Sequence, residues 1–278
     1  MKGRQKSSGS SSHVRFLGSE RENAHDRWYR AVAPYYDQLY DRLRSARAYP
    51  FLQHLFLRYG PIHEVLDVAC GSFALDLPLV RRGYQVVGRD RSKDMLRVAR
   101  GALKAVGRDV DLDEADMRTL HLTREFDALL CLGTAFNYVT SPSDVRRTLA
   151  VFRRHLRGGG LLVLDLTNFD AWIRHPQNAR AEVDHRAPDG TRVAIFAFNE
   201  QERRKKIHQA RFLTLVQKGR RIDIRFDETP LRIWAKPELD RALRTAGFRP
   251  AEWWGDLRLG AKYDRGRSPR LVSVAVRT

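Results

Sequence analysis

The sequence predicts an α/β fold, doubly wound around a mostly parallel sheet. Two observations lead to this prediction. After Pro61, apolar stretches of strand length alternate with amphipathic stretches of helix length. Two of the strand-length stretches, 126–132 and 161–166, are nearly continuous in apolar residues, which is typical of strands buried on both faces.

The N-terminal part divides into two segments. Residues 1–25 are rich in serine, glycine and charge, so they bury little apolar surface and we expect a disordered tail. In residues 26–60, aromatic and aliphatic residues recur at helical spacing, which predicts a helical segment.

Residues 61–180 form the predicted core of alternating strands and helices. Ser92 and Ser141 each precede a helical pattern, and serine is a favoured helix N-cap. Glycines 158–160 are expected to end the helix that begins after Ser141. The strands are expected at 62–69, 86–90, 110–114, 126–132 and 161–166, with a further helix at 74–82.

Residues 181–235 break this rhythm. Apolar and polar residues alternate there between turn residues, which predicts an antiparallel β meander inserted into the fold. Residues 236–278 then complete the core with a helix at 237–245 and two final strands.

The composition is that of a folded protein, with 42% hydrophobic and 30% charged residues. We expect a soluble, cytoplasmic protein, because the chain lacks an apolar run of about 18 residues and an apolar secretory segment at its start. Cys70 and Cys131 have neither the number nor the spacing of a disulfide framework or a zinc site, so no metal is expected.

The formal net charge of +18 raises the question of a nucleic-acid partner. Most of the 51 basic residues are arginines, which a coding bias alone can produce. The basic run at 203–225 alternates with apolar residues, as a solvated strand face does. Nucleic acid is therefore an unfavoured partner that the sequence leaves open.

Acidic residues close three successive predicted strands. Asp67 precedes a turn of small residues, Asp90 ends the second strand, and Asp116 follows the third. Open α/β sheets bind ligands at the carboxyl edge of their strands, where a carboxylate can accept hydrogen bonds from ribose hydroxyls. The three carboxylates predict one nucleoside-sized crevice that favours a cationic ligand and repels a pyrophosphate.

This set of residues resembles the small-molecule branch of the class I S-adenosylmethionine-dependent methyltransferases, over residues 29–278. The resemblance implies a seven-stranded Rossmann-like sheet, S-adenosylmethionine as cofactor, and methyltransferase activity. It implies that Asp67 lies near the methionine ammonium, that Asp90 holds the ribose and that Asp116 faces the adenine amino group. The other cofactor-binding residues that it implies are Ala69, Gly71, Arg91, Met95, Met117, Leu132, Gly133 and Tyr40.

Two further segments extend the resemblance. The aromatic segment 29–40 is similar to the N-terminal lid of small-molecule members, although core packing explains any one tyrosine equally well. The segment 136–139 lacks the Asn/Asp-Pro-Pro-aromatic motif of members that methylate nucleobase amines. Tyr36, Asn137 and Tyr138 are the candidate catalytic residues on the acceptor side. One residue departs from the family's pattern: Phe73 is a bulky residue at the position of the third glycine in the family's cofactor loop.

The expected reaction is in-line methyl transfer to a nitrogen or oxygen of a small-molecule acceptor. A hydroxyl acceptor would need a base, for which His175, His185 and His208 are weak candidates. The meander is expected to roof the acceptor pocket or to form a homodimer contact. The alternatives are an RNA or protein methyltransferase, a non-catalytic cofactor-binding protein, and a dinucleotide enzyme, whose G-x-G-x-x-G loop is only approximated here.

Overall fold

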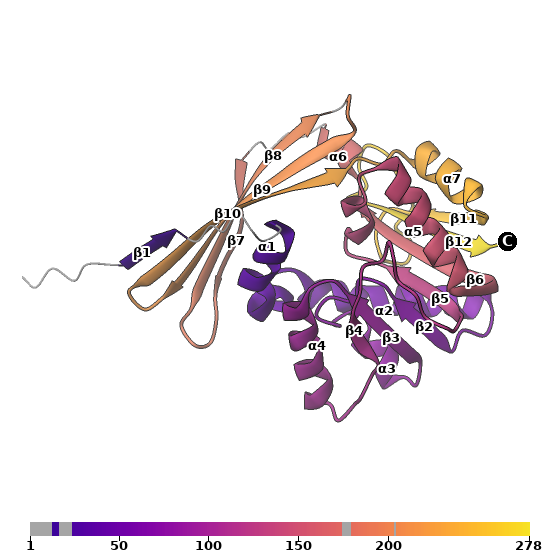
Figure 1. The fold of residues 1–278 in the computed structure, drawn as a ribbon, viewed down its shortest axis with the longest axis horizontal. Coiled ribbons are helices and arrows are strands. Elements are labelled where there is room, and N and C mark those ends of the chain that lie inside the picture. The colour runs from indigo at the N-terminus through magenta and orange to yellow at the C-terminus, as the bar shows by residue number, and fades with distance from the viewer. Residues whose placement is uncertain (1–12, 17–23, 174–178, 203) are drawn as a thin grey trace, which may run out of the picture.

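The computed structural model describes residues 13–16, 24–173, 179–202 and 204–278. Two sheets form the molecule, and Figure 1 shows the second projecting away from the first. The first has seven strands in the order β11-β12-β6-β5-β2-β3-β4. The strands are β2 (Glu64–Asp67), β3 (Gln85–Asp90), β4 (Leu112–Glu114), β5 (Phe126–Cys131), β6 (Leu156–Thr167), β11 (Phe248–Trp254) and β12 (Arg270–Arg277).

The pairing confirms the predicted mostly parallel sheet. β2 pairs in parallel with β3 and β5, and β3–β4 and β5–β6 are parallel as well. Only β12 runs against its neighbours, β6 and β11. Because β2 leads outward to β3 and β4 on one side while β5 and β6 lie on the other, the sheet has its topological switch point between β2 and β5.

Helices cover both faces of this sheet, as the sequence predicts. Neighbouring strand residues point to opposite faces. Val65 therefore packs in one apolar layer and Leu66 in the other. The layer around Val65 is covered by α2 (Arg42–Tyr59), α3 (Leu77–Arg81) and α4 (Lys93–Ala105), and the layer around Leu66 by α5 (Pro142–Arg154) and α7 (Lys236–Thr245).

The predicted serine caps are present. The Ser92 hydroxyl accepts a hydrogen bond from the Met95 amide at 3.3 Å, and the Ser141 hydroxyl accepts one from the Asp144 amide at 3.1 Å. The prediction that glycines 158–160 end the helix after Ser141 was wrong. α5 ends at Arg154, and glycines 158–160 lie inside β6, where the register to β5 shifts by a bulge.

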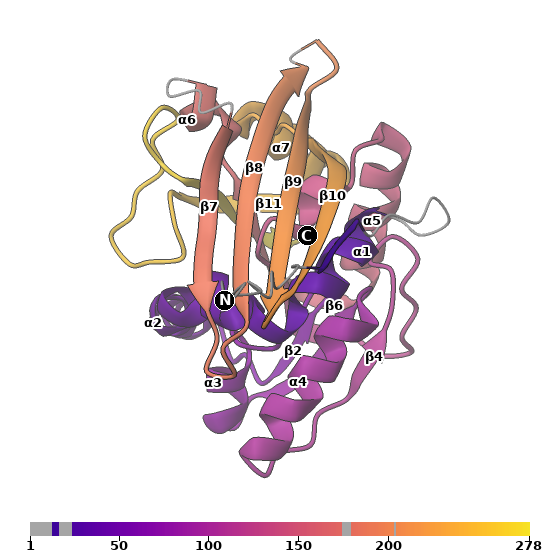
Figure 2. The ribbon, with the colours of Figure 1, turned by 90° about the vertical axis from the view of Figure 1, so that its left-hand side faces the viewer.

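The second sheet has the strand order β1-β10-β9-β8-β7 and is seen in front in Figure 2. Its antiparallel part is the predicted meander: β7 (Ala179–Arg186), β8 (Arg192–Glu202), β9 (Ile207–Lys218) and β10 (Arg221–Arg232). β1 (His13–Phe16) pairs in parallel with β10, although it lies in the segment for which the sequence predicts no fold. The rest of that segment up to residue 23 lies outside the described residues.

The N-terminal segment lies where the two sheets meet (Figure 1). It comprises α1 (Ala24–Val32), the 3-10 helix η1 (Ala33–Tyr35) and the π-helical turn η2 (Asp37–Asp41). Trp28, Val32 and Tyr35 pack against Val193 and Ile195 of β8. The short α6 (Phe169–Ile173) follows β6. Within the described part of the chain, no helix is long and apolar enough to cross a membrane.

Candidate functional site

A cavity of about 300 Å³ lies at the carboxyl ends of β2, β3, β4 and β5. Asp67, Asp90 and Asp116 all line it, each after a different strand, so the three carboxylates share one cleft. The size is at the small end of the range for small-molecule sites, roughly 300–1,000 Å³. The other predicted site residues that line it are Tyr36, Ala69, Gly71, Arg91, Met95, Met117, Leu132, Gly133 and Tyr138.

Asp67 is almost completely buried at the bottom of this cleft. Its carboxylate accepts a hydrogen bond from the Ala69 amide at 2.8 Å. Burial raises the pKa of Asp67 to about 7, the Ala69 amide opposes this shift, and the negative charge of Asp90 adds to it. A bound cation would relieve this burial cost because it favours the charged form of the carboxylate.

Asp90 fixes the loop and the helix on either side of it. One oxygen accepts from the Gly71 amide at 2.8 Å, and the other accepts from the Ser92 amide at 2.7 Å. Burial raises the pKa of Asp90, while the amide hydrogen bonds lower it by less. Each carboxylate oxygen keeps a second lone pair, which a ribose hydroxyl can use.

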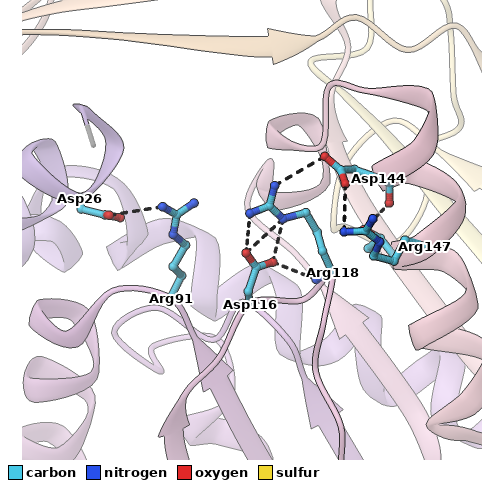
Figure 3. Close-up of polar contacts among 7 residues, drawn as sticks. Asp26, Arg91, Asp116, Arg118, Asp144 and Arg147 are labelled. Carbon is cyan, nitrogen blue, oxygen red and sulfur yellow. Dashed lines mark hydrogen bonds and ion pairs between the residues drawn. The ribbon is translucent and has the colours of Figure 1, made fainter. Parts of the chain in front are cut away.

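Asp116 is paired with an arginine that the sequence analysis did not single out. Arg118 donates to its carboxylate through Nε at 3.0 Å and through Nη2 at 2.6 Å (Figure 3). Burial acts to raise the pKa of Asp116, but the hydrogen bonds and charge of Arg118 outweigh it and hold this pKa below its usual value. Arg118 also lies 3.6 Å from a carboxylate oxygen of Asp144, at the start of α5.

Three tyrosines gather on the side of the cavity away from the sheet. Tyr29, Tyr36 and Tyr138 line it, and Tyr29 is hydrogen bonded to Tyr138. Burial, followed by the nearby Tyr138 and Tyr36, raises the pKa of Tyr29 well above its usual value. A phenol can act both as a hydrogen-bond donor and as an acceptor.

The loop under the cavity takes a glycine-like backbone conformation at Phe73. Phe73 has a φ of 68°, in the left-handed region that favours glycine. Its ring is fully buried in the apolar layer beneath the loop and is absent from the cavity lining. A Cβ at Gly88 on β3 would lie 3.1 Å from the Phe73 ring, so the glycine at 88 makes room for it.

Two predicted residues lie outside the cavity lining. Asn137 is fully buried: its Oδ1 accepts from the Thr167 amide at 3.1 Å and its Nδ2 donates to the Arg232 carbonyl at 2.8 Å. It therefore ties β6 to the end of β10. Tyr40 packs against Tyr36, with ring centroids 5.3 Å apart.

Two of the candidate histidines, His185 and His208, also lie outside the cavity lining. His208 is buried, its ring is stacked on Phe169, and burial lowers its pKa to about 4. His185 is hydrogen bonded to Gln38 at 2.6 Å. His175 lies outside the described residues.

Cavity residues that were missed as individual candidates include Tyr29, Ser72, Arg118, Thr229 and Pro230. Tyr29 belongs to the aromatic segment, and Ser72 and Arg118 lie beside predicted residues, so position alone could have suggested them. No local pattern signals Thr229 and Pro230, because they reach the cavity only through the path of β10.

Ion pairs hold α1 over the site from two directions. On the core side, Asp26 pairs with Arg91 at 3.4 Å (Figure 3) and Arg30 with Asp94 at 3.6 Å. On the meander side, Arg27 donates to the buried Asp227 of β10 at 3.1 Å. The Ser72 hydroxyl also donates to Asp37 of η2, so the cofactor loop touches the helical segment directly.

The turn after β5 is held by a buried ion pair. Thr134 has a φ of 75°, an uncommon conformation for a non-glycine residue. Asp165 accepts from the Gly133 amide at 3.1 Å and pairs with Arg270 at 2.6 Å, and Arg270 donates to the Thr134 hydroxyl at 3.0 Å. The pair thereby fixes Gly133 at the cavity wall.

Comparison with known proteins agrees with this geometry. Residues 65–160 match the family described as "Methyltransferase domain". The chain is 35% identical over 154 residues to a glycine/sarcosine N-methyltransferase of Parasynechococcus marenigrum, covering 54% of this chain and 51% of the relative. It is also 27% identical to a dTDP-3-amino-3,4,6-trideoxy-alpha-D-glucopyranose N,N-dimethyltransferase of Streptomyces venezuelae. This match covers 67% of this chain and 75% of the relative.

The fold comparison extends over nearly the whole chain. A crystal structure of an S-adenosylmethionine-dependent methyltransferase from Clostridium acetobutylicum superposes with a TM-score of 0.76 at 18% identity, covering 90% of this chain and 99% of the other. In sequence, the chain spans about half the length of the glycine/sarcosine N-methyltransferase that it matches.

The fold, the cleft and the family match agree with one another. The chain has the class I S-adenosylmethionine-dependent methyltransferase fold. Residues 65–160 are similar to the methyltransferase domain family.

The cavity fits the cofactor of this class. Gly71 lines the cavity and has a φ of 54°, a backbone conformation that favours glycine. The buried carboxylate of Asp67 and the half-buried carboxylate of Asp90 supply acceptors for an ammonium and for ribose hydroxyls. They would repel a pyrophosphate.

Proposed function

We propose that this protein is an enzyme that transfers a methyl group from S-adenosylmethionine to the nitrogen of a small-molecule amine. The observation that carries the proposal is the shared cleft of Asp67, Asp90 and Asp116 beneath three tyrosines. The named relatives methylate glycine, sarcosine or an amino sugar nucleotide, and these acceptors share an amine on a small polar molecule.

Three groups of residues would hold the cofactor. Asp67 would bind the methionine ammonium and Asp90 the ribose, with Ala69 and Gly71 beneath them. Asp116, Met117 and Arg91 would surround the adenine end, and Met95 would close the floor. Leu132 and Gly133 would lie beside the sulfonium. When bound, the cofactor supplies a methyl group on a positively charged sulfur, which is an excellent leaving group.

The tyrosines would form the acceptor side. A neutral amine can attack in line without a strong base, so the chain's task is to align it and to exclude water. Tyr36 and Tyr138 can accept hydrogen bonds from an N–H and orient the nitrogen lone pair toward the methyl group. Thr229 and Pro230 bring β10 over the same cavity, which supports the meander as a roof of the acceptor pocket.

A transfer assay tests the proposal. Purified protein is incubated with S-adenosylmethionine carrying a labelled methyl group and with glycine, sarcosine or an amino sugar nucleotide. We expect labelled product from at least one amine, and a loss of kcat in Tyr138→Phe larger than any change in cofactor affinity. Tight cofactor binding without transfer to any amine, hydroxyl or RNA acceptor would instead indicate a non-catalytic binding protein.

We further propose a homodimer. The outer face of the second sheet exposes Phe196, Phe198 and Phe226, and Phe196 and Phe226 flank Leu213 on the neighbouring strand. Exposed apolar patches of this kind mark interaction sites. Sedimentation of the intact protein and of Phe226→Lys tests it: a dimer that dissociates in the variant supports the contact, and a monomer at all concentrations contradicts it.

A further inference from the structure

A second carboxyl lies behind Asp67, outside the cavity lining. Asp76 is fully buried at the N-terminal end of α3. An aspartate at this position usually caps the helix, yet the Asp76 side chain makes no capping hydrogen bond. Neither carboxyl oxygen of Asp76 meets a backbone or side-chain N–H or hydroxyl donor. A buried carboxyl in this position needs another partner.

That partner is the carboxyl of Asp67. The carboxyl groups of Asp67 and Asp76 lie within hydrogen-bonding reach of each other. A hydrogen bond between two carboxyls requires that one of them keep its proton. The other titratable groups that face the pair are Asp90 and the thiols of Cys70 and Cys131, and none of these carries a positive charge.

The surroundings decide which carboxyl keeps the proton. Asp67 borders the cavity and accepts the Ala69 amide, and both features favour its charged form. Asp76 has no such donor. Burial raises the pKa of both groups, to about 7 for Asp67 and well above the usual value for Asp76.

We propose that Asp76 is a positioning residue of the site: it stays protonated, donates its hydrogen bond to Asp67, and keeps the Asp67 carboxylate charged and aimed at a cationic ligand. This inference rests on the proposed function, because it takes the ammonium of S-adenosylmethionine as that ligand. Without the donor, Asp67 would lose part of the stabilisation of its charged form and would be free to rotate.

Two substitutions separate this role from a packing role. Asp76→Asn keeps a neutral donor of the same shape. Asp76→Leu removes the donor but fills the space with an apolar side chain, so it tests the hydrogen bond without opening a cavity. Leu79→Val is the matched control, because it disturbs packing of the same short helix without touching either carboxyl.

Affinity for S-adenosylmethionine is measured by calorimetry at pH 6, 7 and 8, together with the melting temperature of the ligand-free protein. We expect Asp76→Asn to bind within about threefold of the unaltered protein. Asp76→Leu should bind about tenfold more weakly at pH 7, the loss of one hydrogen bond to a charged group. Its affinity should recover toward pH 8. Leu79→Val should melt lower and bind normally.

Three results would overturn the proposal. Unchanged affinity in Asp76→Leu would mean that Asp76 does not act on the site. Equal losses in both Asp76 variants would mean that Asp76 acts as a charged carboxylate. If Asp76→Leu does not fold, an Asp76→Asn variant that binds more than threefold more weakly is sufficient to refute the proposal. Failure of the proposed function itself would appear separately, as absence of binding by the unaltered protein.

Discussion

Asp116 and Arg118 form a two-point ion pair at the rim of the cavity, with the guanidinium bound to both carboxylate oxygens. The carboxylate assigned to the adenine amino group is therefore already held in place by the protein. Its remaining lone pairs are available to a ligand, and Arg118 fixes their direction.

This relationship predicts coupling between the two residues. Arg118→Ala should weaken S-adenosylmethionine binding about fivefold, because Asp116 loses its orientation, but should have no further effect in an Asp116→Ala background. Arg118→Lys should not restore binding, since an ammonium lacks the two-point geometry. A double-variant cycle by calorimetry measures the coupling. Additive losses would show that Arg118 contacts the ligand independently.

The two attachments of α1 should differ in strength. Arg27→Ala leaves the buried Asp227 without this partner and should cost about 3–5 kcal/mol of unfolding free energy. Asp26→Asn breaks an exposed pair with Arg91 and should cost less than about 1 kcal/mol. Urea denaturation measures both. Equal costs would contradict a stronger attachment of α1 to the meander than to the core.

Phe73 should matter for stability and little for binding. Phe73→Gly relieves a left-handed backbone, worth about 1–2 kcal/mol, but removes a buried ring, which costs about 3–5 kcal/mol. The variant should therefore be less stable by about 1–4 kcal/mol in urea denaturation, with cofactor affinity within threefold. A gain of stability, or a large gain of affinity, would place the ring in the cofactor space after all.

His208 should make the fold sensitive to acid. Its pKa is lowered to about 4 in the folded state by burial, so the unfolded state binds more protons between about pH 4 and pH 6.5. Its contribution to stability is present above pH 6.5 and is lost as the pH falls. Between pH 7.5 and pH 5 the unaltered protein should lose about 2 kcal/mol more than His208→Gln in denaturant titrations. Parallel losses would mean that His208 is charged or exposed.

The strands of the core were predictable because burial on both faces requires nearly continuous apolar residues. The starts of two helices were predictable because a serine N-cap bonds to the adjacent turn of its own helix. The three carboxylates were predictable for a similar reason: parallel strands bring their carboxyl ends to one edge. The position of each carboxylate at the end of its strand then determines that the three meet in one cleft.

The parts that sequence did not reveal depend on packing between distant segments. Asn137 was predicted as a site residue because it lies beside Tyr138 in the sequence. Neighbouring positions on a short helical turn point in different directions, so Asn137 lies outside the cavity lining. β1 pairs with β10 across more than two hundred positions, and its composition gives no local strand signal. The Asp67–Asp76 contact depends on how α3 packs behind the loop, which no short-range pattern encodes.

The central claim is that buried carboxylates at one sheet edge grip a positively charged nucleoside. Calorimetric titration with S-adenosylmethionine and with NAD, on the unaltered protein and on Asp90→Asn, tests it most directly. We expect binding of S-adenosylmethionine alone, weakened about tenfold or more in the variant. Preferential binding of NAD, or an affinity for S-adenosylmethionine that does not change in Asp90→Asn, would contradict it.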